Sequence, residues 1–120
     1  MPRFFVAPAA QLDMEEVLEW TQNQWGEKAR LRYEALLFRA ILDVAMNPTL
    51  PGSSDRSEIA REARTYHTGN SRNRVAKKIG RVNKPRHLLL YRIRADGLVE
   101  IGRVLHESMD LVRHLPDEFA

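Results

Sequence analysis

The sequence contains no cysteine. This absence excludes disulfide bonds, a thiol nucleophile, iron–sulfur clusters and the thiolate zinc sites of ribbons and fingers. Its four histidines are scattered and its six glycines are isolated, so the sequence predicts neither a histidine metal site nor a glycine-rich phosphate loop. We therefore expect no metal and no other cofactor.

Long apolar runs are also missing. The longest nearly apolar stretch, residues 4–10, is far shorter than the roughly 20 residues that a membrane helix needs. Asp13, Glu15 and Glu16 follow at once, which is not typical of a signal peptide. We therefore expect no membrane span and interpret residues 2–7 as a first β-strand.

The chain is short, with 120 residues of which 43% are hydrophobic. A chain of this size folds around a single core that is not large. We expect one domain over residues 1–120. The modest core leaves an obligate partner, a homodimer or a hetero-oligomer open.

Positive charge is concentrated in one third of the chain. Residues 56–94 carry a net charge of +10, whereas residues 1–55 carry −3 and residues 95–120 carry −4. Residues 70–86, here called the basic loop, hold seven Lys and Arg and no acidic residue. Such a segment attracts phosphates or an acidic protein surface. Composition alone equally allows a solvated loop whose charges only maintain solubility.

Two amphipathic helices are predicted in the first half. Apolar residues recur with helical spacing over 10–25, acidic residues fill the opposite face, and Gly26 ends this pattern. A second pattern runs over 27–46 and stops before Pro48 and Gly52. The link between the two is so short that the helices must form an antiparallel hairpin.

Three aromatic residues, Trp20, Trp25 and Tyr33, lie on these helices. Such side chains can form a stacking platform for nucleic-acid bases. At helical spacing, burial in the core is their commoner role. The sequence therefore favours a core position for them and keeps base stacking as the alternative.

Strand patterns dominate the second half. Residues 87–94 are nearly continuously apolar, which predicts a central strand, and the Ala-Asp-Gly sequence at 95–97 predicts a hairpin turn. The other elements expected here are a strand over 59–68, a helical turn near 75–79 in the basic loop, a return strand over 98–106, and a short helix that Ser108 caps and Pro116 ends. The predicted fold class is α+β, with an N-terminal strand and a helix hairpin packed on one face of a small, mostly antiparallel sheet.

A regular hairpin between the last two strands brings Arg92 opposite Glu100, an exposed pair that contributes a few tenths of a kcal/mol. This register leaves Arg92, Glu100 and His106 on the open face of the sheet, where Gly102 allows a bulge or a close approach. Arg103 is expected on the helix-facing side, with its head on a backbone carbonyl. The other expected pairs are Leu90 with Gly102, Leu88 with Val104, Tyr91 with Ile101, and Ile93 with Val99.

The most specific pattern lies near the C-terminus, with HLLLYR at 87–92, RVLH at 103–106 and MD at 109–110. It follows RTYHTG at 64–69. Together with the Trp-Gly pair that ends the first helix, these residues resemble the RelE/ParE superfamily of type II toxin–antitoxin systems, and its ParE-like toxins most of all. The resemblance covers nearly the whole chain, and the basic loop is an insertion, longer and more basic than the usual link.

The resemblance implies a cytoplasmic, growth-inhibiting bacterial toxin, of the kind linked to plasmid stabilisation, which an antitoxin encoded beside it binds and silences. Some relatives poison DNA gyrase, which needs no catalyst on the toxin, and others cleave messenger RNA in the ribosome as endoribonucleases. We favour the gyrase poison because the nuclease set is incomplete. Leu88, or its neighbour His87 or Arg86, stands where the nucleases have an arginine, Glu107 follows the last strand, and the C-terminal segment holds no tyrosine. A degenerate, non-toxic module that only binds the antitoxin is a third interpretation.

Each interpretation has its own candidate residues. We expect an antitoxin helix on the exposed side of the helix hairpin, with its tail along the sheet near Arg64, Arg92 and the basic loop. The antitoxin-binding candidates are Arg30, Arg32, Arg39, Arg64 and Arg92. The target-binding candidates are Arg64, Arg72, Arg74, Lys77, Lys78, Arg81, Lys84, Arg86 and Arg92. For a nuclease, which needs cations around the phosphate and a base, the catalytic candidates are Arg64, His87, Arg92, Arg103 and His106.

Overall fold

The computed structural model describes residues 3–119. The elements in chain order are β1 (Phe4–Val6), α1 (Pro8–Trp25), α2 (Glu27–Met46), β2 (Ser53–Asp55), β3 (Ala63–His67), the 3₁₀ helix η1 (Thr68–Arg74), β4 (His87–Ile93), β5 (Val99–His106), and the 3₁₀ turns η2 (Val112–His114) and η3 (Asp117–Phe119). Within these residues the strands form one sheet in the order β1-β5-β4-β3-β2. β1 runs parallel to β5, and the other pairs are antiparallel. The expected α+β class is confirmed; Pro2, in the expected first strand, lies outside the described residues.

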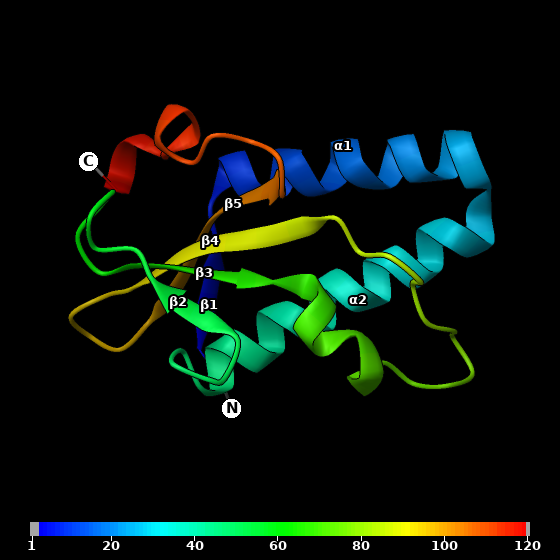
Figure 1. Ribbon diagram of the computed structural model, residues 1–120, viewed down its shortest axis with the longest axis horizontal. Coiled ribbons are helices and arrows are strands. Elements are labelled where there is room, and N and C mark those ends of the chain that lie inside the picture. The colour runs from blue at the N-terminus through cyan, green and yellow to red at the C-terminus, as the bar shows by residue number, and fades with distance from the viewer. Residues whose placement is uncertain (1–2, 120) are drawn as a thin grey trace.

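The helix hairpin forms where the apolar spacing predicts it (Figure 1). α1 ends at Gly26, whose φ of 94° strains any residue that has a side chain. Leu37, Ile41 and Val44 of α2 are buried in the cluster that joins the helices to the sheet. Neither helix is long and apolar enough to span a membrane, and the same holds throughout residues 3–119.

The expected core position of both tryptophans is wrong. Trp20 is 58% exposed and Trp25 is 72% exposed, whereas Tyr33 is buried as expected. The second half of α1 runs beyond the ends of the strands, as Figure 1 shows. Side chains on its last turns therefore have no sheet beneath them, whatever their spacing along the helix.

The segment between α2 and β4 differs from the expectation in three places. The chain forms an edge strand, β2, directly after Gly52, and this strand was not predicted. β3 begins at Ala63 rather than at Ile59, because a turn with Glu62 at a φ of 61° precedes it. A 3₁₀ helix that was not predicted lies at 68–74, and the expected turn near 75–79 is a single one, in which the Ile79 N–H donates to the Ala76 carbonyl at 3.0 Å. A three-residue strand is too short to show a period of two, so only its partner strand could reveal it.

A β-bulge at Gly102 corrects the expected register of β4 and β5. The predicted pairs nearest the turn, including Arg92 with Glu100, are confirmed. Beyond the bulge, Leu90 pairs with Arg103 and Leu88 pairs with Leu105, so the pairs with Gly102 and Val104 are wrong. The extra residue moves each later side chain of β5 to the opposite face of the sheet from the one expected. His106 consequently lies on the helix side of the sheet, 5.4 Å from the ring centre of His87, and not on the open face.

The face of the sheet opposite the helices is covered rather than open. Phe119 packs there with Leu90 and Leu105, and a Cβ at Gly102 would lie 2.6 Å from the Phe119 ring. Glu100, expected to be open, is 4% exposed. The covering segment forms two 3₁₀ turns and not the expected short helix. Ser108 does not cap it, because its hydroxyl and its N–H both contact Nδ1 of His106.

Candidate functional site

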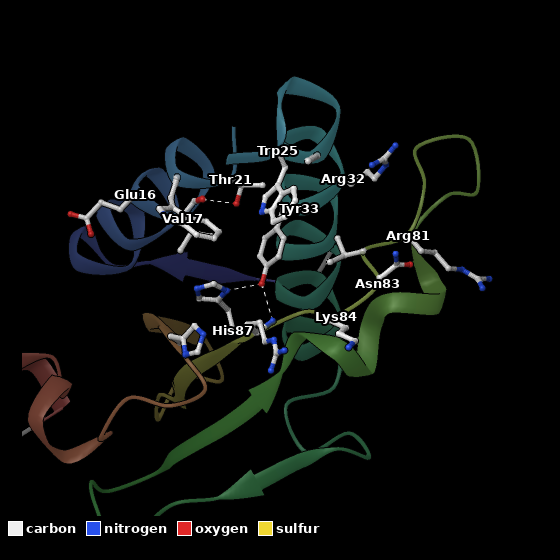
Figure 2. A pocket seen from close by; sticks show the side chains of 15 residues that line it. Glu16, Val17, Thr21, Trp25, Arg32, Tyr33, Arg81, Asn83, Lys84 and His87 are labelled. Atoms are coloured by element: carbon white, nitrogen blue, oxygen red, sulfur yellow. Dashed lines mark hydrogen bonds between the residues drawn. The ribbon is translucent and has the colours of Figure 1, made fainter. Parts of the chain in front are cut away.

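A cleft of about 920 Å³ lies between α1, α2 and residues 81–87 (Figure 2). This volume falls in the range of small-molecule sites, about 300–1,000 Å³. Apolar side chains line one part of it and basic side chains line another, so we call it the aromatic–basic cleft. The apolar residues are Val17, Trp20, Trp25, Ala29, Tyr33 and Val82, and the basic residues are Arg32, Arg81, Lys84 and Arg86.

A neutral pair forms the floor of the aromatic–basic cleft. The Tyr33 hydroxyl lies 2.6 Å from Nδ1 of His87 and accepts a hydrogen bond from the Arg86 backbone N–H at 3.1 Å. Burial, with His106 and His67 nearby, lowers the pKa of His87 to about 4. Burial raises the pKa of Tyr33, so both groups are uncharged at neutral pH.

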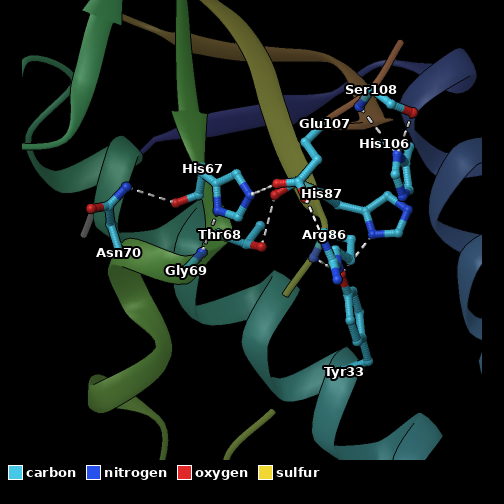
Figure 3. A network of polar contacts seen from close by, with 10 residues as sticks. All are labelled: Tyr33, His67, Thr68, Gly69, Asn70, Arg86, His87, His106, Glu107 and Ser108. Carbon is cyan, nitrogen blue, oxygen red and sulfur yellow. Dashed lines mark hydrogen bonds and ion pairs between the residues drawn. The ribbon is translucent and has the colours of Figure 1, made fainter. Parts of the chain in front are cut away.

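A carboxylate connects three strands beside this floor (Figure 3). Glu107, just after β5, contacts Arg86 at 3.0 Å and His67 at 2.8 Å. Hydrogen bonds from Arg86 and then from His67 lower the pKa of Glu107. Glu107 thus occupies the Arg86 and His67 side chains, which lie beside the floor of the cleft.

The basic loop is anchored at its start and exposed beyond it. The buried Ser71 hydroxyl lies 2.6 Å from Asp43 and 2.8 Å from the Tyr66 hydroxyl. Arg72 donates to the Val82 carbonyl at 2.7 Å, which closes the loop across its base. Arg74 contacts Asp43 at 3.5 Å. In the part of the chain that the structure describes, no ion pair involves the exposed cations Lys77, Lys78, Arg81 and Lys84.

Two of the nuclease candidates stabilise the fold. Arg103 binds the Asp13 carboxylate at 2.7 and 2.8 Å and donates to the His114 carbonyl at 3.2 Å. The carbonyl contact confirms the expectation for Arg103, and the carboxylate adds to it. Arg92 contacts Glu100 at 3.1 Å and lies over the Phe119 ring at 4.7 Å.

The nuclease candidates as a set do not converge on one point, although the ring centres of His87 and His106 lie 5.4 Å apart. Arg64 pairs across the strands with Tyr91, which packs against the helices, and donates to Ser53 at 2.7 Å. Arg92 pairs with Ala63 and lies on the opposite face of the sheet. His87 is on the helix side, at the other end of β4 from Arg92. A single phosphate could not meet all of these groups.

Residues 4–111 match the family model described as the ParE toxin of type II toxin–antitoxin systems. The chain belongs to this family. It is 31% identical to Toxin ParE1 from two strains of Mycobacterium tuberculosis, CDC 1551 / Oshkosh and H37Rv, over 113 residues that cover 94% of this chain and 97% of each relative. The resemblance to ParE-like toxins is thereby confirmed. Membership of the ParE family implies a cognate antitoxin as partner.

The antitoxin-binding candidates on α2 of this ParE family toxin differ in their surroundings. Arg30 donates to Gln22 at 2.7 Å, and Arg39 contacts the buried Asp43 at 2.9 Å. Arg32 lies against Gly80, between the aromatic–basic cleft and a second groove of about 900 Å³. This outer groove is lined by Lys28, Leu31, Arg32, Glu34, Ala35, Phe38, Lys78 and Ile79.

Sequence reasoning missed several residues that shape these sites. Trp25 directly precedes Gly26, which ends the helix. This position at a helix end was the one feature of the sequence that could have indicated the exposure of Trp25. Asp13 resembled any acidic residue in the first turns of a helix, although it contacts β5, about ninety positions away. Tyr33 was expected in the core, but nothing in the sequence indicated its bond to His87.

Proposed function

We propose that this ParE family toxin acts in the cytoplasm as a poison of DNA gyrase, which blocks replication until the cognate antitoxin binds it. The observation that supports this proposal is the contrast between the two sets of candidates. The nuclease candidates lie on opposite faces of the sheet or hold the fold together, whereas Lys77, Lys78, Arg81 and Lys84 are exposed. A poison needs a binding surface and no catalytic group, because the lesion comes from the DNA cleavage chemistry of gyrase.

The basic loop is the proposed contact with gyrase or with its DNA. Its exposed cations match phosphates or an acidic surface, and the bond between Arg72 and Val82 holds its two ends together. Deleting residues 71–84 is a poor test, because this deletion removes the buried Ser71 and its bonds to Asp43 and Tyr66. Charge removal at Lys77 and Lys78 changes the surface alone.

Pulse labelling of new DNA and new protein in bacteria is the direct test. After induction without antitoxin, we expect DNA synthesis to fall within minutes while translation continues. The double variant Lys77→Gln/Lys78→Gln should weaken this arrest, and Arg113→Gln, an exposed cation near the C-terminus, should not. An early halt in translation would instead assign the ribosome as the target. Normal synthesis of both would leave a module that only binds the antitoxin.

We also propose that a helix of the antitoxin occupies the outer groove of α2. Leu31 and Phe38 are about half exposed there and are two turns apart on one helix face, which is the spacing that a partner helix contacts. Lys28 and Lys78 flank them, so a second copy of this chain would bring like charges together. An acidic amphipathic helix fits both features.

The double variant Leu31→Ala/Phe38→Ala should raise the Kd for the antitoxin roughly 1,000-fold, because two buried interface anchors that contribute about 2 kcal/mol each sum to about 4 kcal/mol. Titration calorimetry with the cognate antitoxin measures this change, and Leu12→Ala, an exposed apolar side chain of α1 outside both grooves, is the matched control. Charge reversal at Arg39 is avoided, since it would place a carboxylate beside the buried Asp43. An unchanged Kd would show that the helix docks elsewhere.

A further inference from the structure

Both tryptophans of the chain lie in the aromatic–basic cleft, and both are more than half exposed. They are on α1, five residues apart, beyond the part of the helix that packs on the sheet (Figure 1). Exposed indole rings contribute nothing to the core. An indole face in a cleft is a stacking surface, because a flat aromatic ligand covers it without having to match its polar groups.

The charge of the aromatic–basic cleft is arranged along one side. Arg81 and Lys84 come from residues 81–87, and Arg32 comes from α2. Figure 2 shows Glu16, the only acidic residue of the lining, at the opposite end from Arg81 and Lys84. Arg32 also lines the outer groove, where Lys78 adds a further cation. This arrangement suits a ligand with a neutral aromatic part and several negative groups in a row.

The floor adds neutral hydrogen-bonding groups. His87 lines this floor, and its low pKa keeps the ring uncharged. The exposed amide of Asn83 offers a donor and an acceptor. Such groups can meet the edge of a base without requiring a counter-charge.

We propose that the aromatic–basic cleft binds an unpaired nucleotide of a single-stranded nucleic acid. The base stacks on Trp25, and the flanking phosphates contact Arg81 and Lys84. Paired bases in a duplex have both faces stacked and cannot enter. An acidic peptide would also meet the cations, but it gives no reason for two exposed indole rings in the same cleft. This inference concerns binding by the toxin alone and does not depend on gyrase being the target.

Fluorescence anisotropy with labelled 12-nucleotide strands of thymidine or of uridine tests the proposal on the purified full chain. We expect binding to both strands, with quenching of tryptophan emission, and at least tenfold weaker binding to a 12-base-pair duplex. Trp25→Ala should weaken binding roughly tenfold, and Trp25→Phe, which keeps a smaller ring, should recover much of the loss. Tighter binding of thymidine would indicate DNA as the source of the strand, and tighter binding of uridine would indicate RNA.

Salt dependence tests the phosphate contacts separately. The double variant Arg81→Gln/Lys84→Gln should lower the slope of log K against log salt by about 1.4, because each contact with a single strand contributes about 0.7. Arg113→Gln should leave the slope unchanged. The proposal is overturned if neither strand binds, if the duplex binds as well as the single strands, or if Trp25→Ala binds like the parent chain. Loss of antitoxin binding by Trp25→Ala with strand binding intact would assign the cleft to a peptide instead.

Discussion

Replacing Asp13 by alanine is expected to lower the free energy of unfolding by about 3 kcal/mol, the range found when one partner of a largely buried ion pair is removed. The Asp13 carboxylate accepts from Nε and Nη2 of Arg103 and, at 2.9 Å, from the backbone N–H of Val104. It is 8% exposed. The hydrogen bonds that Arg103 donates to Asp13 raise the pKa of Arg103 further. Without Asp13 the guanidinium still keeps its charge, because arginine stays protonated in proteins.

The location of Asp13 explains why the effect should be large. β1 covers β5 only as far as Ile101, and the edge of β5 is left without a strand beyond that point. Asp13 of α1 accepts the N–H that a longer β1 would have bound. Alanine would leave this buried N–H and the Arg103 head without their partner, and both carry a desolvation cost.

Urea denaturation at pH 7 measures the effect. Asp13→Asn keeps an acceptor for Val104 but loses the charge, so we expect a loss of about half that size. Glu15→Ala, an exposed acidic position on the same helix, should change stability by less than about 0.5 kcal/mol. A loss below about 1 kcal/mol for Asp13→Ala would contradict the proposed role of the carboxylate at the sheet edge.

Acid is expected to destabilise the fold through His87. The pKa of His87 is about 4 in the folded chain, against 6.5 for an ordinary histidine, so between these values the unfolded chain binds the extra proton. The contribution of neutral His87 to the free energy of unfolding is therefore complete above pH 6.5 and is lost as the pH falls toward 4. A complete shift of this size corresponds to about 3 kcal/mol, and partial solvent access to the ring lowers our expectation to about 2 kcal/mol.

His87→Gln provides the comparison for this pH effect. Glutamine can still accept from Tyr33 but does not titrate, so the loss of stability between pH 7 and pH 4 should be about 2 kcal/mol smaller in this variant. Unfolding in urea at several pH values measures the difference. His114→Gln serves as control and should retain the parent dependence. Equal curves for the parent chain and His87→Gln would contradict a neutral His87 in the fold.

The family and most of the fold were accessible from local pattern. The apolar period of α1 and α2, the glycine between them and the hairpin turn at 95–97 depend on residues close in the chain, and each was confirmed. The motifs at 87–92 and 103–106 supported the ParE family, which the family model then matched. The pairing of Arg92 with Glu100 was also predictable, because a tight turn sets the register of the residues beside it.

The predictions were wrong where a feature depends on contacts between residues far apart in the sequence. One extra residue at Gly102 changed every later pair of β4 and β5 and moved His106 to the other face. The edge strand β2 exists through its bonds to β3 and has no period of its own. The C-terminal segment covers the face that was expected to be open, because Phe119 packs on the glycine of the bulge.

The sequence by itself determined that this chain has a helix hairpin, a β-hairpin and one concentrated block of positive charge, since spacing, turn residues and composition act locally. Only the tertiary structure decided that Trp20 and Trp25 are exposed, that Asp13 completes the edge of β5, and that burial keeps His87 neutral. The physical reason is that exposure and hydrogen bonding depend on which surfaces meet. A helix that extends past its sheet leaves its last turns uncovered. The spacing of apolar residues within that helix does not indicate where the sheet ends.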